Sequence, residues 1–99
     1  MRTLVRFSLP IEKGNQAYDD GTLGKTMETL LAKLKPEAAY FCPIGGKRGG
    51  MFVFDMADSA QIPVVLEPLF GKLNAEVEIS PVMNADDLKK GIAAAKAGG

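Results

Sequence analysis

Two kinds of hydrophobic pattern follow one another along the chain, and their order predicts the fold. Four segments look like strands, because apolar and polar residues alternate in them or because β-favouring residues dominate: 3–9, 38–42, 51–56 and 75–82. Between them, apolar residues recur at helical spacing over 15–35 and 62–70. The resulting order, β-α-β-β-α-β, predicts an α+β domain built on one antiparallel sheet.

The first helical segment is expected to run from about Asn15 to Lys35. Its apolar stripe consists of Leu23, Met27, Leu30, Leu31 and Leu34. Gly21 and Gly24 weaken its first turns, so a loose or separate turn is expected around 16–20. Pro36 should end the helix, because the residue before a proline avoids helical geometry.

The second helical segment has its own boundary signals. Asp58 stands three residues before Gln61, which is the spacing of a capping box. The apolar stripe that follows consists of Ile62, Val65, Leu66, Leu69 and Phe70. Pro68 should bend or shorten the last turn, and Gly71 is expected to end the helix.

A third helix is expected at the C-terminal end, from about Ala85 to Ala97. Asn84, with Asp87 three residues later, is a suitable N-cap. This segment is rich in alanine, with Leu88 and Ile92 as its larger apolar residues. We therefore expect a peripheral helix that adds to the core unit of residues 2–83, within one domain that spans 1–99.

The right-handed crossover rule places both connecting helices on one face of the sheet. The residues expected beneath the helices are Val5, Phe7, Phe52, Phe54, Val77 and Ile79. The opposite face, called the open face below, then holds Leu4, Arg6, Ser8, Met51, Val53, Asp55, Glu76, Glu78 and Ser80. In the second strand two alternatives remain, since either Tyr40 or Phe41 belongs to the open face. This face carries too many apolar residues to stay bare, so a homodimer that packs two open faces together is expected.

Composition excludes several kinds of chemistry. The 99 residues hold 12 basic and 12 acidic side chains, so no net charge attracts nucleic acid or an anionic membrane. The chain has no histidine and one cysteine, so it offers few ligands for zinc or haem. A Ser-His-Asp triad is excluded because it needs a histidine. We expect no cofactor and no metal. No apolar run approaches the length of a membrane span or a signal peptide, so a cytoplasmic location is expected.

Several segments together resemble a known superfamily. The order of elements and the mixed open face are similar to the dimeric α+β barrels, in which two ferredoxin-like sheets pair. The closest resemblance is to small bacterial proteins of unknown function in that superfamily, through 35–41, the glycine-rich 45–50, Ile62-Pro63, 67–70 and 75–83. The resemblance implies a ferredoxin-like fold, a homodimer and a lumen between the sheets. It brings no substrate and no catalytic residue, because the haem enzymes of the superfamily use a histidine that this chain lacks.

Four polar residues are candidates to line that lumen: Arg6, Tyr40, Asp55 and Glu78. They could bind a small carbonyl or aromatic metabolite and assist proton transfer through a carboxylate. Two alternatives stand beside this hypothesis. Arg6 lies on a central strand and could simply form a cross-strand ion pair, and the open face could serve dimerisation alone in a structural protein. Whether the protein is an enzyme stays open.

The glycine-rich segment Gly45-Gly-Lys-Arg-Gly-Gly50 could suggest phosphate or RNA binding. However, a strand follows it where a phosphate-binding loop needs a helix, so a hairpin turn is expected. The third strand also has Gly50 and Asp55 where an RNA-recognition module has aromatic residues. We therefore expect no nucleic-acid partner, and we expect Cys42 to be a small buried hydrophobic residue.

Overall fold

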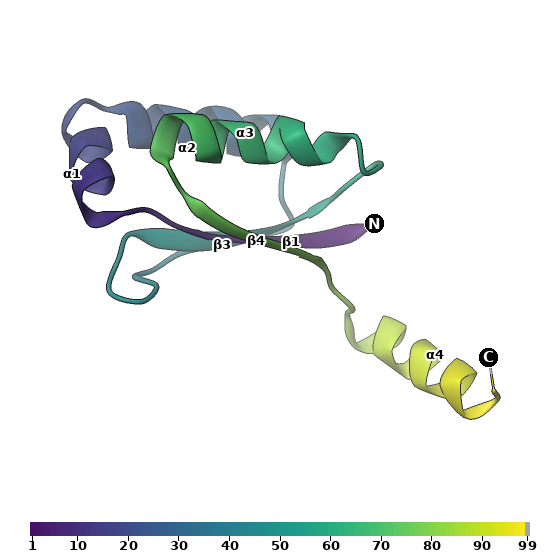
Figure 1. The fold of residues 1–99 in the computed structure, drawn as a ribbon. Helices are drawn as coiled ribbons and strands as arrows, with labels where there is room; N and C mark the ends of the chain where they lie inside the picture. The colour runs from purple at the N-terminus through teal and green to yellow at the C-terminus, as the bar shows by residue number, and fades with distance from the viewer. Residues whose placement is uncertain (99) are drawn as a thin grey trace.

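One antiparallel four-stranded sheet carries three helices on one of its faces. The computed structural model describes residues 1–98, and its elements follow the expected order (Figure 1). They are β1 (Arg2–Ser8), α1 (Ile11–Asp19), α2 (Thr22–Leu34), β2 (Ala38–Phe41), β3 (Gly49–Asp55), α3 (Gln61–Leu73), β4 (Glu76–Pro81) and α4 (Ala85–Lys96). The strand order β2-β3-β1-β4, with antiparallel neighbours throughout, is that of a ferredoxin-like α+β fold.

The core lies between the sheet and the helices, as the alternating patterns predict. Val5, Phe7, Phe52 and Phe54 are buried, and Val77 and Ile79 are partly buried against the same cluster. Met27 and Leu30 of α2 and Val65, Leu66, Leu69 and Leu73 of α3 cover them from above. The open-face residues of β1 and β3 alternate with these and are partly or fully exposed. The two predicted faces of the sheet are confirmed.

The first helical segment differs from the expectation. It divides into two helices, because Gly21 has a φ of 82° and adopts a left-handed conformation between them. α1 begins at Ile11, directly after Pro10, four residues before the expected start. The separate turn predicted near 16–20 is therefore the end of a nine-residue helix.

The boundaries of α3 also differ. Gly71 does not end the helix, which continues to Leu73 and stops at Asn74 in a left-handed conformation. Pro68 lies inside the helix. The predicted capping box is wrong as well: Asp58 accepts a hydrogen bond from the backbone N–H of Ala60, and Gln61 accepts one from that of Ala57. Leu73 is fully buried, and this tertiary contact extends the helix past the glycine.

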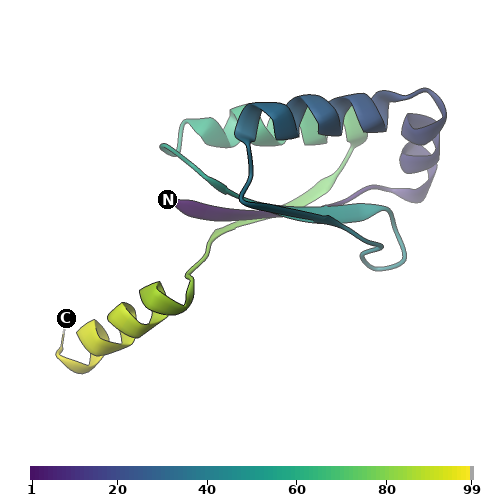
Figure 2. The same cartoon turned by 180° about the vertical axis from the view of Figure 1, so that it is seen from behind.

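The C-terminal helix is confirmed within one residue. Asn84 caps α4 in a capping box with Asp87, as its spacing predicts. None of its residues is buried. In two opposite views α4 projects beyond the end of the sheet, on the side away from α1, α2 and α3 (Figures 1 and 2).

Candidate functional site

Three of the four residues predicted to line a lumen lie in one row across the open face. The strand register places Tyr40 of β2 opposite Met51 of β3, Met51 opposite Arg6 of β1, and Arg6 opposite Glu78 of β4. Paired residues in an antiparallel sheet point to the same side. Tyr40 therefore belongs to the open face, and Phe41 to the helix-covered face.

The cross-strand ion pair considered for Arg6 is present. Arg6 Nη1 lies 3.6 Å from Glu78 Oε1, and both side chains are largely exposed. An exposed pair of this kind contributes little to stability. Each partner satisfies the other, so neither offers an uncompensated charge to a ligand in the single chain.

Asp55 lies apart from this row. It pairs with Arg2 in the register, four residues along β1 from Arg6, which corresponds to about 13 Å. Its Oδ1 is 2.6 Å from the Met1 ammonium group, and that hydrogen bond, with the attraction between the charges, lowers the pKa of Asp55. A carboxylate with a lowered pKa is a weak base, so Asp55 is poorly suited to abstract a proton.

The glycine-rich segment forms a turn that two backbone hydrogen bonds between Ile44 and Lys47 close. Gly45 and Gly46 both have positive φ, at 59° and 78°, as the central residues of a type I′ hairpin turn require. The backbone N–H of Ile44 donates to the carbonyl of Lys47, and the N–H of Lys47 donates back. The N–H groups of Ile44 and Lys47 are thus used within the turn, and this is the hairpin turn that the sequence predicts.

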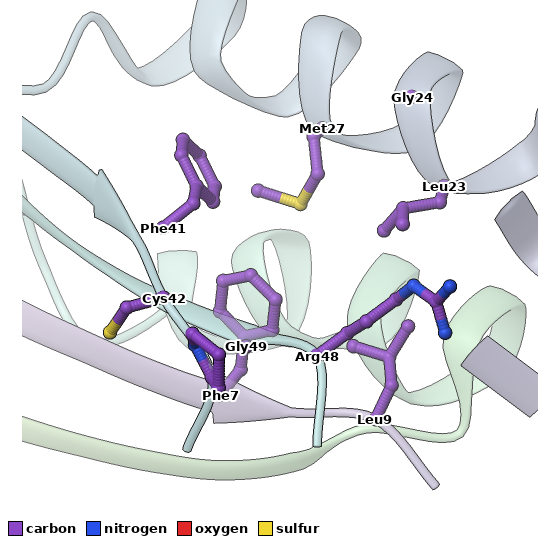
Figure 3. Close-up of a pocket in the computed structure, with 10 residues that line it drawn as sticks. Phe7, Leu9, Leu23, Gly24, Met27, Phe41, Cys42, Arg48 and Gly49 are labelled. Carbon is purple, nitrogen blue, oxygen red and sulfur yellow. The ribbon is translucent and has the colours of Figure 1, made fainter. Parts of the chain in front are cut away.

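A cavity lies on the other side of the sheet, where no sequence pattern indicated one. It has a volume of about 450 Å³ and lies between α2, the end of β1 and the β2–β3 hairpin (Figure 3). Phe7 and Phe41 line it from the sheet, and Leu23 and Met27 point into it from α2 (Figure 3). Its volume falls within the range of about 300–1,000 Å³ that is usual for small-molecule sites.

The hairpin shapes the floor of this cavity. Gly50 stands between Phe41 and Phe7 in the register. A Cβ at Gly50 would lie 2.7 Å from Phe41 Cδ1 and 2.9 Å from the carbonyl oxygen of Tyr40. The ring of Phe41 thus lies over the backbone of Gly50, and any larger residue there would push it away.

Arg48 provides a cation at the rim. Its Nη1 donates a 2.6 Å hydrogen bond to Asn15 Oδ1, and its guanidinium carbon is 5.4 Å from the centre of the Tyr18 ring. Both partners lie on α1, which packs against the hairpin through the buried Gly14. None of the four ion pairs among residues 1–98 involves Arg48. Four of its five N–H donors therefore have no carboxylate or amide partner from the described chain.

Cys42 lies at the edge of the cavity and is exposed, so the prediction of a buried cysteine is wrong. The cause is the shortness of β2, which ends at Phe41 and leaves Cys42 beyond the sheet.

The sequence patterns do not predict the cavity, because its polar part depends on α1. That helix is short and carries little apolar surface, with Gly14 and Ala17 as its buried residues. A pattern search for apolar spacing therefore misses it. One available signal was Pro10, which stands at the N-cap of α1, one residue before the position that proline favours in helices.

The described residues add no metal site. Residues 1–98 contain no cluster of three or more potential metal ligands, and none of their helices is long and apolar enough to cross a membrane.

The chain matches no family model, and a search of curated proteins finds no relative.

Proposed function

We propose that the protein binds a small amphiphilic anion, an aromatic or aliphatic carboxylate, in the cavity between α2 and the hairpin. One observation carries the proposal: an almost wholly apolar cavity of about 450 Å³ has a guanidinium without an acidic partner at its rim. Apolar walls favour a ring or chain, and a guanidinium favours a carboxylate in bidentate geometry.

Binding is favoured over catalysis by the residues that line the cavity. Among them, Arg48 and Cys42 alone have ionisable side chains. A guanidinium stays protonated and cannot act as a general base. Cys42 has no histidine or further cysteine beside it in the sequence, so nothing in this chain supplies the usual partner of a nucleophilic thiol.

The test is a titration with 1-naphthoate and with its neutral analogue 1-naphthalenemethanol. Arg48→Gln should weaken naphthoate binding about 10-fold, since a hydrogen bond to a charged group contributes about 1.5–3 kcal/mol and is partly screened here. Binding of the neutral alcohol should change less than about 3-fold. Leu23→Trp should fill the cavity and weaken both probes.

The matched control is Lys47→Gln. It removes the same charge from the neighbouring residue, which does not line the cavity, so it should leave both affinities unchanged. Chemical shifts of the Met27 methyl group should move with either probe. Failure of naphthoate to bind, or equal losses in the Arg48 and Lys47 variants, would contradict the proposal.

The open face favours a second candidate, a homodimer with a lumen between two sheets. Its apolar residues Leu4, Met51 and Val53 are only partly covered, and Tyr40 is exposed. Pairing two such faces would bury this surface and enclose the row of Tyr40, Arg6 and Glu78. In that space a small carbonyl or aromatic compound could bind, or the interface could be purely structural.

Light scattering tests this homodimer. The unmodified chain should have twice the mass of one polypeptide, and Val53→Lys should halve it by placing charges inside the interface. Val64→Lys, the same change on the exposed side of α3, should leave the mass unchanged. Naphthoate-induced shifts at Tyr40 and Met51 would assign the ligand to the lumen, and shifts at Met27 to the cavity. A monomer at all concentrations would exclude this candidate and leave the cavity proposal untouched.

A further inference from the structure

The C-terminal helix has an apolar stripe that no other helix or strand of residues 1–98 covers. Leu88 and Ile92, four residues apart, lie on one side of α4 and are 48% and 49% exposed. Ala85 and Ala95 extend the same stripe. A free helix of 12 residues is marginal in water, so α4 needs a packing surface to be stable.

The start of the helix is fixed to the body of the molecule. Asn84 and Asp87 form the capping box, and Asp87 Oδ2 also lies 3.2 Å from Arg2 Nη1 on the central strand β1. These polar side-chain contacts all belong to the first turn of α4 and its cap. The later turns are thus held out from the domain in a fixed direction (Figures 1 and 2).

α4 extends on the side of the sheet that carries the open face. α4 lies on the opposite side of the sheet from the helix layer in both views (Figures 1 and 2). The helix that carries the exposed apolar stripe and the apolar open face therefore lie on the same side of the sheet. A symmetric partner that packs on the open face is the nearest body for α4 to reach.

The area of the sheet also favours a second copy of the chain as the partner of α4. Four strands of up to seven residues project an area of roughly 440 Å². A standard interface buries about 800 Å² of accessible surface on each partner. A 12-residue helix is about 18 Å long and 10 Å wide, so it adds a projected area of about 180 Å². The helix that each subunit supplies would thus enlarge the projected contact by about two fifths of the area of the sheet.

Charge is complementary as well. Lys89 and Lys96 lie beside the apolar stripe, and α4 has no acidic residue after Asp87. The edge strand β4 presents the exposed Glu76 on the open face, and none of the ion pairs among residues 1–98 involves it. A lysine of one subunit can thus lie near this carboxylate of the other, which would favour a second copy over an unrelated apolar surface.

We propose that α4 crosses onto a second copy of the chain and packs the stripe of Leu88 and Ile92 against it. This inference rests on the homodimer proposed above and adds a second contact to it. The open faces form the centre of the interface, and the contact of α4 with the other copy, called the clasp below, adds to it at the side.

The test compares two double variants by analytical ultracentrifugation. Leu88→Gln with Ile92→Gln should raise the dimer dissociation constant at least about 100-fold, because the interface loses four half-buried side chains. Lys90→Gln with Ala94→Gln has the same spacing on the far side of α4 and should change it less than about 3-fold. Glutamine is a good helix former, so helix propensity does not explain a loss.

An isotope-filtered NMR experiment on a mixture of labelled and unlabelled chains identifies what covers Ile92. Contacts between the Ile92 methyl groups and the other copy support the clasp. Contacts only within one copy would show that α4 folds back on its own sheet, and would overturn it. A dimer that the Leu88 and Ile92 changes do not weaken would overturn the clasp and leave the sheet-face homodimer standing. A monomeric chain, including one whose α4 binds anionic vesicles instead, would overturn both.

Discussion

Gly49 lies where the hairpin passes closest to the strand beside it. A Cβ on Gly49 would be 2.6 Å from the backbone carbonyl oxygen of Phe7, which cannot rotate away. Backbone shifts forced by such a clash typically cost about 1–3 kcal/mol. The cavity floor and the strand register thus both depend on a residue without a side chain.

Gly49→Ala should therefore lower the free energy of unfolding by about 1–3 kcal/mol, measured by urea denaturation. Gly71→Ala is the control, because nothing lies within 4 Å of a Cβ at that helical position. It should be neutral or stabilising. Equal effects of the two substitutions would show that the close approach to Phe7 does not limit the hairpin.

Asp20 shows how one side chain holds the start of a helix. Hydrogen bonds from the hydroxyl and the backbone N–H of Thr22 lower the pKa of Asp20, and the N–H donates over 2.8 Å. Since the folded-state pKa lies below the unfolded one, this contact stabilises the fold above the unfolded pKa, about 3.9. The contribution is lost as the pH falls through the lowered folded pKa.

Thr22→Val should move the pKa of Asp20 back toward its ordinary value, because it removes the hydroxyl donor and leaves the backbone N–H. The carboxyl carbon signal of Asp20 in an NMR titration measures this directly. Thr29→Val, on the exposed surface of α2, should not move it. An unchanged pKa in the Thr22 variant would assign the whole effect to the backbone donor.

At the scale of elements, patterns of apolar spacing predicted the four strands and the two faces of the sheet, and the spacing of Asn84 and Asp87 predicted the cap of the C-terminal helix. They failed where an element carries little apolar surface, as α1 does with buried Gly14 and Ala17. They also failed where a buried residue overrides a local signal, as Leu73 does beyond Gly71. The open-face positions of Arg6 and Glu78 followed from strand alternation, whereas the choice between Tyr40 and Phe41 was left open and is decided by the register. The cavity depends on how α1 and α2 meet the hairpin, which no periodicity encodes.

Replacing glycine with alanine should have opposite effects on the free energy of unfolding at two positions near the break between α1 and α2. Gly24 lies inside α2, and a Cβ added there would meet nothing within 4 Å, so Gly24→Ala should raise the free energy of unfolding by about 0.5–1 kcal/mol. Gly21 has a φ of 82°, so Gly21→Ala should lower it by about 1–2 kcal/mol. Urea denaturation of both variants provides the check. Stabilisation by Gly21→Ala would mean that the two helices can merge into the single helix that the sequence suggests.

At the scale of the whole molecule, the projecting helix determines the shape. The radius of gyration is 15.7 Å, and the principal extents are 54 × 27 × 18 Å. A compact domain of this length has a radius of about 13 Å. The excess comes from α4, which leaves the domain without burying any residue. A monomer of this shape would expose the open face and the stripe of α4 together, and contiguous exposed apolar surface is typical of interaction sites.

Association should therefore appear as a stability that depends on protein concentration. If folding and dimerisation are coupled, the Tm should rise by about 5 °C between about 1 µM and 100 µM, because mass action favours the dimer. The Leu88→Gln, Ile92→Gln variant should lose most of this dependence, since its dissociation constant moves above the range tested. Naphthoate should raise the Tm of both proteins equally, because the cavity lies on the other face of the sheet from the interface. A ligand effect confined to the dimer would instead place the binding site between the sheets, at Tyr40 and Arg6.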